Sequence, residues 1–330
     1  MKKIMFILLF FSAALSFALD CSVCGRKIRG NYIKDNKNNA FCSKKCFATT
    51  VPKCEYCKKP CTKGAFTFFK KYYCSKKCLN QVARCQSCSQ STTKLRIIIN
   101  QDGTKIMLCR NCANQPKCYF CVLPYRTQQL NDGRWICFNC RKTAVTDPAA
   151  VQKHFKNVRN LLHKLFGFDP NHKIELHILT LPQLEKESKS LYRIQGGGRM
   201  ALMRYEYEIQ EKSNFHGKKT RKLTKQRCRM FVLSHTPLDL LKDAIAHELT
   251  HDYLRHNAGN ISDLKIEEGF AEAIAAKYND AVKKSHLNKR KQNNPDEVYG
   301  GGYRTMSKML KERGFAQTMK YIKSRAKPIL

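Results

Sequence analysis

The residues of this chain that are best suited to chemistry stand close together in its C-terminal half. They belong to the run His247-Glu248-Leu249-Thr250-His251, which is followed after sixteen further residues by Glu268. Because residues four apart lie on one face of a helix, His247 and His251 can both direct an imidazole nitrogen at one zinc ion. Glu248 would then act as the catalytic base of an H-E-x-x-H metallopeptidase, with Glu268 as the third protein ligand.

The residues around this motif predict the helices that it needs. Thr236 is the expected N-cap of the first helix, and Pro237 its first helical residue. Apolar residues then recur at helical spacing and predict one buried face: Leu240, Leu241, Ala244, Ile245 and Leu249. A second helix, from about residue 264 to 278, carries Glu268, with Ile266, Phe270, Ile274 and Ala275 as its core stripe. If the two helices pack face to face, Glu268 reaches both histidines.

The segments before the motif predict the rest of the domain. A helix is expected to begin after its N-cap Asp147 and to stop at Gly167. Three strand-like runs follow, at residues 173–181, 199–209 and 226–234. Strands before the active-site helix and helices after it predict an α+β fold, with a zincin-like metallopeptidase domain over residues 147–330.

Sixteen of the eighteen cysteines form four sets with a repeated spacing. Each set has a C-x-x-C pair, an intervening segment of about fifteen to twenty residues, and a second pair. Two such knuckles can present four thiolates to one zinc ion at about 2.3 Å. The four sets are Cys21, Cys24, Cys42 and Cys46; Cys54, Cys57, Cys74 and Cys78; Cys85, Cys88, Cys109 and Cys112; and Cys118, Cys121, Cys137 and Cys140.

A disulfide framework is the alternative for these cysteines, because even cysteine counts in exported chains usually mean disulfides. The spacing favours zinc, since two cysteines separated by two residues rarely bond to each other but routinely chelate a metal. Of the two remaining cysteines, Cys61 is a candidate spare ligand for the second set. Cys228, in a strand-like run, is expected to be a buried thiol.

The cysteine sets also predict how the N-terminal half is organised. Residues 41–46 resemble residues 73–78, which indicates an internal repeat of about thirty residues. A unit of this size cannot bury a core of its own, so metal binding must supply its folding free energy. We expect LIM-like or treble-clef zinc modules, paired over residues 19–80 and 81–142. With the catalytic ion, the chain would carry about five zinc ions.

The first residues have the pattern of a secretory signal peptide. Lys2 and Lys3 precede an apolar run, and Ser16 and Ala18 are small residues before a cleavage site. We therefore expect residues 1–18 to be removed and the mature chain to be secreted or extracytoplasmic, with no remaining transmembrane span. The alternative is an uncleaved membrane anchor, for which the apolar run is short.

The strong positive charge bears on the partners of the protein. Lysine and arginine exceed aspartate and glutamate by 37, with clusters at residues 218–229 and 283–291. Such a charge with zinc knuckles is compatible with nucleic-acid binding. The charge is spread along the chain, however, and the expected export argues against nucleic acid. We expect a protein or peptide substrate, with attraction to acidic proteins or anionic surfaces.

Several runs of the C-terminal half resemble the LIM-peptidase family of plant growth regulators, the DA-one family. The matching runs are Asp132-Gly133-Arg134 with Cys137 and Cys140, His247 to Leu254, Glu267-Glu268-Gly269, Val298 to Arg304, and Gly314-Phe315. The resemblance covers roughly residues 115–327. It implies a gluzincin-type zinc peptidase preceded by LIM-like modules, with His247, His251 and Glu268 as ligands and Glu248 as base.

These observations together favour a secreted or lumenal zinc endopeptidase whose zinc modules bind a substrate or partner. The oxyanion of the reaction needs a donor besides zinc, and Tyr299 or Tyr303 in the glycine-rich segment is the candidate, although either could be a core tyrosine. The alternative functions are a zinc-module adaptor protein with a vestigial peptidase domain, and a disulfide-rich secreted adhesin. Because only six residues separate Cys140 from Asp147, the last zinc module is expected to pack against the peptidase domain.

Overall fold

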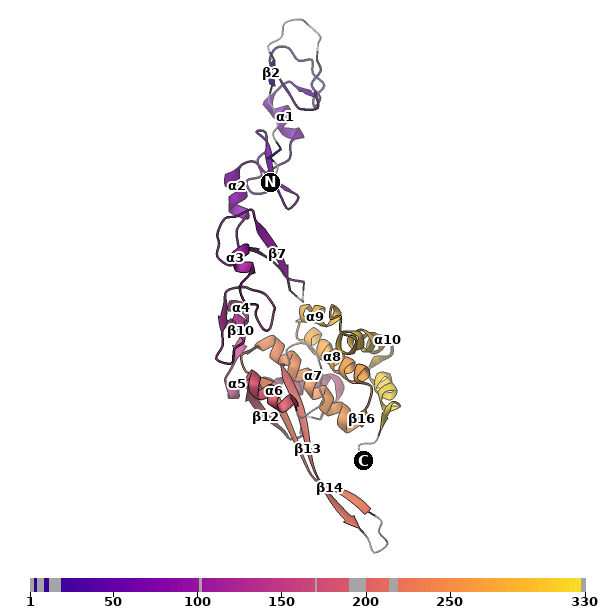
Figure 1. The fold of residues 1–330 in the computed structure, drawn as a ribbon. Helices are drawn as coiled ribbons and strands as arrows, with labels where there is room; N and C mark the ends of the chain where they lie inside the picture. Colours follow the sequence, from indigo (N-terminus) through magenta and orange to yellow (C-terminus); the bar gives the residue numbers. More distant parts are fainter. Residues whose placement is uncertain are drawn as a thin grey trace. The chain divides into compact units, whose positions relative to one another are not determined.

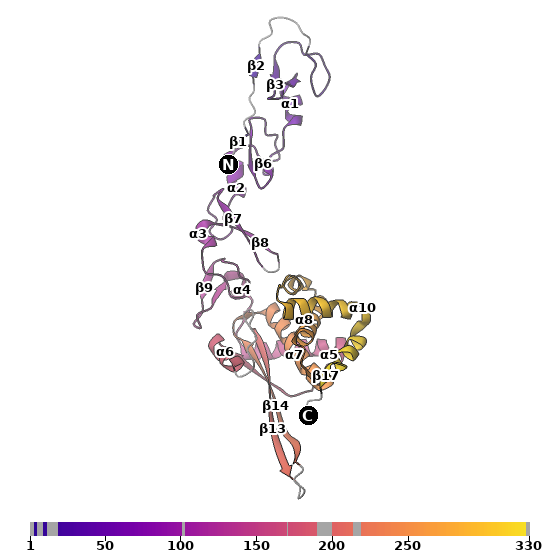
Figure 2. The same ribbon diagram turned by 45° about the vertical axis from the view of Figure 1, so that its right-hand side comes forward.

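The computed structural model describes residues 3–4, 9–11, 19–100, 103–169, 171–189, 200–213 and 219–327. Their contacts divide the chain into two units, Met1–Ile98 with Ile106–Asn114, and Ile99–Lys105 with Gln115–Leu330. The mixture of helices and strands confirms an α+β protein with cysteine-rich clusters (Figures 1 and 2). Of the expected signal peptide, only the backbone of β1 (Lys3–Ile4) and β2 (Leu9–Phe11) is described, so that expectation stays a prediction.

The four cysteine modules share one local plan of a knuckle, a short hairpin and a short helix that carries the last cysteine. The hairpins are β3 (Tyr32–Lys34) with β4 (Ala40–Phe41), β5 (Ala65–Phe68) with β6 (Lys71–Tyr73), β7 (Leu95–Ile99) with β8 (Lys105–Cys109), and β9 (Thr127–Gln129) with β10 (Trp135–Cys137). The helices are α1 (Lys44–Thr50), α2 (Lys76–Val82), α3 (Arg110–Ala113) and α4 (Phe138–Lys142). Ser43 and Ser75 cap α1 and α2 by accepting bonds from the N–H groups of Cys46 and Cys78.

Each knuckle turns at the residue that follows its second cysteine. Gly25, Lys58, Ser89 and Val122 all have φ between 60° and 68°, and each donates its N–H to the carbonyl of the first cysteine. Only one of the four is a glycine, although positive φ is costly for a β-branched residue such as valine. The turn is therefore imposed by the requirement that both thiols point to one centre.

A three-stranded sheet organises the C-terminal domain, in the order β12 (Ile174–Leu179), β14 (Lys219–Leu233) and β13 (Ala201–Ser213). β12 runs parallel to β14, and β13 runs antiparallel to it. Beyond β12, β13 and β14 continue as a two-stranded arm (Figure 1). The strands lie where the sequence predicts them, but β13 and β14 are longer than predicted. Their distal residues are largely charged, so the apolar pattern does not reveal that part of the strands.

The central strand β14 alternates between two apolar clusters. Cys228, Met230 and Val232 face the cluster formed with α5 (Pro148–Phe166) and α7 (Leu238–Asn257). Phe231 and Leu233 face a second cluster, which contains residues of the fourth cysteine module and Leu184 of α6 (Leu181–Lys189). Since successive side chains of a strand point to opposite faces, β14 fixes α7 on one side and the module on the other.

The helices confirm most of the predicted boundaries and correct one. Asp147 caps α5, and Gly167, with φ of 71°, ends it. The expected N-cap Thr236 is wrong: Thr236–Pro237 forms strand β15, which pairs with β11 (Ala144–Val145), and α7 begins at Leu238 without a side-chain cap. The Thr236 hydroxyl instead donates to the carbonyl oxygen of Leu233, and the Thr236 backbone pairs with β11. Thr236 therefore does not cap the helix.

The last helices pack around α8 (Leu264–Ala281), which lies against α7 in both views (Figures 1 and 2). They are α9 (Asn288–Gln292) and α10 (Gly302–Lys323), with the short turns η1 (Ser285–Leu287) and η2 (Glu297–Gly301). A Cβ atom at Gly269 would lie 2.4 Å from the backbone of Gly302, so the two glycines let α8 and α10 approach closely. β16 (Asn260–Ile261) pairs with β17 (Ala326–Lys327) and closes the domain.

The fourth cysteine module packs against the C-terminal domain through an apolar contact and through hydrogen bonds made by a buried ion pair of the module. Its residues Phe120 and Ile136 share a cluster with Phe231, Leu233 and Leu240. The side chain of Arg134 is 1% exposed. Its guanidinium donates to the carboxylate of Asp132 at 2.7 Å and to the carbonyl oxygen of Ser234 at 3.0 Å. Most of the third module, residues 85–98 and 106–112, falls in the first unit, and residues 99–105 fall in the second with the fourth module; the expected pairing of the two modules stays a prediction.

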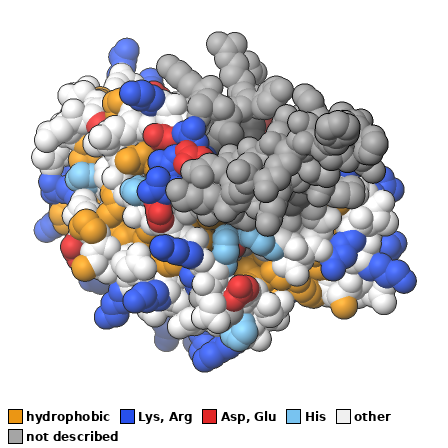
Figure 3. All heavy atoms as spheres, turned by 90° about the horizontal axis from the view of Figure 1, so that it is seen from below, with side chains coloured by type: hydrophobic (Ala, Val, Ile, Leu, Met, Phe, Trp, Pro, Cys, Tyr) orange, Lys and Arg blue, Asp and Glu red, His pale blue; other side chains and the backbone are white. Residues whose placement is uncertain are grey.

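Positive charge is scattered over the visible face of the molecule (Figure 3). In the basic run at residues 283–291, Lys291 is buried, whereas Lys284 is exposed and pairs with Asp239 at 2.9 Å. Within the described residues, no helix has the length and apolar character that crossing a membrane requires.

Replacing Arg134 by alanine tests the importance of the buried pair. Removal of one partner leaves Asp132 buried without its counter-charge, which costs about 3–5 kcal/mol. In urea titrations, the free energy of unfolding of Arg134→Ala should be lower than that of the wild type by this amount. The matched exposed variant Arg141→Ala should have the wild-type free energy of unfolding. Equal unfolding curves for both variants would show that the pair contributes nothing to the docking of the module.

Candidate functional site

The helices α7 and α8 bring the two histidines of the H-E-x-x-H motif to Glu268. The Nε2 atoms of His247 and His251 lie 3.1 Å apart. The Oε2 atom of Glu268 lies 3.2 Å from Nε2 of His247 and 3.5 Å from Nε2 of His251. A tetrahedral zinc ion with N and O ligands at about 2.0–2.1 Å has ligand atoms about 3.3 Å apart. The three donor atoms therefore fit one zinc ion.

Two further carboxylates of α8 contact the outer nitrogens of the same histidines. Nδ1 of His251 lies 3.2 Å from Oε1 of Glu267, within hydrogen-bond distance. Nδ1 of His247 lies 3.7 Å from Oε1 of Glu272, a longer ion-pair distance. Carboxylates in this position fix the tautomer and the ring orientation of metal-binding histidines. The sequence pattern alone does not indicate a role for Glu267 or Glu272, although residue 272 lies one helical turn after residue 268.

The charges of this cluster depend on each other. Burial lowers the pKa of His247 and His251, but the nearby carboxylates outweigh it, so both pKa values stand above the ordinary histidine value. Burial raises the pKa of Glu268, yet the hydrogen bonds from the two histidines outweigh it and hold that pKa well below the usual range. Glu268 is thus anionic although only 7% of it is exposed. An anionic oxygen beside two imidazoles suits a divalent cation.

A buried lysine extends the cluster away from the histidines. Nζ of Lys291 on α9 lies 3.0 Å from Asp243 of α7 and also contacts the carboxylate of Glu272. Asn279 of α8 donates to the other oxygen of Asp243 at 2.7 Å. The pKa of Lys291 is raised: burial lowers it, and the two carboxylates outweigh that effect. The charged lysine holds Glu272 in place beside His247.

Glu248 lies between the two histidines in the sequence and is half-buried on α7. The two tyrosines proposed as oxyanion donors differ in their surroundings. Tyr303 belongs to the apolar core around α8 and α10, and burial raises its pKa. Tyr299 is half-buried, and the glycine-rich segment that carries it forms the helical turn η2. The assignment of either as a donor stays a prediction.

The four cysteine sets are each collected into a cluster with all four sulfur atoms within 4.8 Å of one another. Neighbouring sulfurs lie 3.5–3.9 Å apart, as in Cys24 with Cys42 and Cys88 with Cys109. A zinc tetrahedron with bonds of about 2.3 Å has edges of about 3.8 Å, whereas a disulfide bond is about 2.0 Å. No disulfide bond joins any of the eighteen cysteines in this structure. These distances favour zinc over disulfides.

The backbone prepares some of these thiols for metal binding. N–H groups of Cys42, Cys24 and Val23 hydrogen-bond to Cys21 and lower its pKa to about 6. At Cys54 burial raises the pKa, but similar N–H donors outweigh it and the pKa is again about 6. A lowered pKa favours the thiolate, which is the form that binds zinc.

The two cysteines outside the sets are buried. Cys61 packs in the core of the second module, in the same apolar cluster as Cys54, and its expected role as a spare ligand beside the set of four stays a prediction. Burial raises its pKa to about 11. Cys228 is buried as predicted, and burial raises its pKa to about 12.

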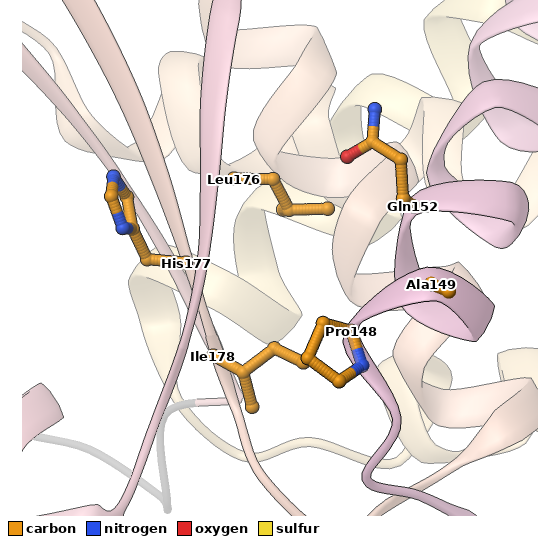
Figure 4. A pocket seen from close by; sticks show the side chains of 6 residues that line it. All are labelled: Pro148, Ala149, Gln152, Leu176, His177 and Ile178. Atoms are coloured by element: carbon orange, nitrogen blue, oxygen red, sulfur yellow. The ribbon is translucent and has the colours of Figure 1, made fainter.

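A surface hollow of about 510 Å³ lies apart from the candidate zinc site. It is formed between the start of α5 and β12 (Figure 4). None of the residues that line it belongs to the histidine–glutamate cluster: they are Pro148, Ala149, Gln152, Leu176, His177 and Ile178. Its lining is largely apolar, and we assign it no role in the chemistry.

Comparison with known proteins finds a distant relative. The chain is 24% identical to Protein DA1 of Arabidopsis thaliana over 306 residues, which cover 81% of this chain and 54% of that protein. The chain thus spans about half the length of the curated relative that it matches. No protein-family model and no solved structure matches it. The similarity and the four cysteine clusters together support zinc-binding modules.

Neutralising the outer carboxylates tests whether they support a metal site. Changing Glu267 or Glu272 to glutamine keeps the volume but removes the charge that orients each histidine, so the affinity for zinc should fall by about 10–100-fold. Titration with a competing chelator measures this affinity, and Glu312→Gln on the exposed face of α10 is the control. Unchanged affinity in both variants would contradict the supporting role.

Proposed function

We propose that the chain is a zinc-dependent peptidase whose active site is formed by α7 and α8. The observation that carries the proposal is the convergence of three donor atoms, one each from His247, His251 and Glu268, at separations of 3.1–3.5 Å. The presence of Glu248 in the same helical turn adds the group that distinguishes a hydrolytic site from a structural one.

The roles of the residues follow from their chemistry. His247, His251 and Glu268 would hold a zinc ion, which would supply a water of lowered pKa and a Lewis acid for the scissile carbonyl group. Glu248 would serve as the general base that accepts a proton and passes it to the leaving amine. Glu267 and Glu272 keep the two imidazoles oriented through their Nδ1 atoms. Glu268, held anionic by its neighbours, contributes a negative oxygen to the site.

Glutamine at position 248 separates catalysis from metal binding. Glu248→Gln removes the proton acceptor but no ligand, so the cleavage rate of an unstructured peptide should fall by at least about 10²-fold. Zinc content and thermal unfolding should stay near the wild-type values, whereas His247→Ala should lose both zinc and activity. Undiminished turnover in Glu248→Gln would exclude this mechanism.

We propose further that the zinc modules position a protein substrate and that the protein acts outside the cytoplasm. The fourth module supports the first point, because it packs against β14 and α7 and so presents a fixed surface on the peptidase domain. The pattern of residues 1–18 supports the second. A surface that holds a substrate near the site raises its effective concentration without changing the chemistry.

Truncation separates the contribution of the fourth module to stability from the contribution of the first three modules to substrate binding. A chain of residues 115–330 keeps the fourth module and should cleave a short peptide as the full chain does, with lower efficiency on a folded protein substrate. A chain of residues 147–330 exposes Phe231 and Leu233 and should in addition lose stability. The cleavage rates of both truncated chains are measured on both substrates. If residues 115–330 cleave the folded protein as efficiently as the full chain does, the first three modules do not position this substrate.

A further inference from the structure

A second group of metal-binding side chains lies on the sheet side of α7, next to the candidate active site in sequence but outside its cluster. His172, Asp252 and His256 offer two imidazole nitrogens and one carboxylate oxygen that lie within 4.8 Å of one another. His172 precedes β12, and the other two residues belong to the last turns of α7. Sequence spacing does not indicate this group, because 80 residues separate His172 from Asp252.

The distances within this group are those of a metal site. Nδ1 of His172 lies 3.0 Å from the carboxylate of Asp252, and Nδ1 of His256 lies 3.4 Å from its Oδ1 atom. Both values are close to the separation of about 3.3 Å between ligands of a tetrahedral zinc ion. The two rings meet edge to face with centroids 4.4 Å apart. Nδ1 of His256 also donates to the backbone oxygen of Asp252 at 2.8 Å, a bond that ligation through Nδ1 would replace.

The surroundings hold the three side chains as the outer shell of a metal site does. The hydroxyl of Tyr205 on β13 donates to Oδ1 of Asp252 at 3.1 Å. Arg159 of α5 donates to the backbone oxygen of His172 and so fixes the segment that carries this ring. Ligating carboxylates are commonly hydrogen-bonded in this way. Asp252 is buried, while His172 and His256 are 22% and 38% exposed, so an ion can enter from solvent.

We propose that His172, Asp252 and His256 form a second divalent metal site, which binds zinc or a similar transition-metal ion. Two imidazoles with one carboxylate select such ions over calcium and magnesium, which prefer oxygen ligands. The ion joins the segment before β12 to the last turns of α7 and thereby fixes the active-site helix to the sheet. Because ligation competes with the bond to the Asp252 backbone, this site binds zinc less tightly than the four-cysteine clusters do.

Zinc uptake by the full chain tests the proposal. The protein is first treated with a chelator that removes weakly held metal, and Zn²⁺ uptake is then followed by calorimetry and elemental analysis. The wild type should take up about two ions per chain, one in each histidine-containing site. His172→Ala/His256→Ala and His247→Ala/His251→Ala should each take up about one ion, and the combination of all four changes should take up none. Ca²⁺ should not compete.

Two further variants keep the outcome interpretable. The exposed His286→Ala should take up zinc like the wild type. Asp252→Asn keeps the shape of the side chain and an acceptor for Tyr205, so it should fold but lose one ion and the part of the zinc-dependent rise in melting temperature that this ion contributes.

Wild-type uptake in both His172→Ala/His256→Ala and Asp252→Asn would overturn the second site and leave a hydrogen-bonded network only. Wild-type uptake in His247→Ala/His251→Ala would instead contradict the proposed active site, so the two failures are distinguishable.

Discussion

The packing of α8 against α7 is the contact on which the candidate site depends. α8 presents three carboxylates, Glu267, Glu268 and Glu272, to the two histidines of α7, and Glu268 is almost fully buried there. Buried like charges are unfavourable unless counter-charges neutralise them. Lys291 compensates Glu272 and Asp243, and the imidazoles donate hydrogen bonds to the other carboxylates, so a divalent cation would supply the remaining positive charge.

The rest of the domain serves to hold these helices at the required distance. Gly269 and Gly302 allow α10 to pack closely on α8, and any side chain at either position would push the helices apart. On the other side, the alternate residues of β14 place α7 on one face and the fourth cysteine module on the opposite face. The module is thus part of the structure around the candidate site, because its buried residues Phe120 and Ile136 belong to a cluster that it shares with the C-terminal domain.

Much of the site was predictable because it is local. The i, i+4 spacing of His247 and His251, the apolar stripes of α7 and α8, and the capped helix after Asp147 follow from rules that act within a few residues. The cysteine sets are also local, since each pair is closed by one turn. Prediction from the sequence was wrong where a local preference competed with a tertiary contact. Thr236 has the residue type of an N-cap, but Thr236 and Pro237 pair with β11 instead of capping α7.

The sequence by itself determined the residue types of the candidate zinc sites, their assignment to helices and knuckles, and the mixture of helices and strands. Only the tertiary structure decided which distant side chains share a site. Glu272 contacts both His247 and Lys291, His172 meets Asp252 and His256, and Arg134 reaches Ser234 across the module boundary. The reason is physical: a buried charge requires a partner, but the chain can supply it from any element that packs nearby, and sequence spacing does not specify that element.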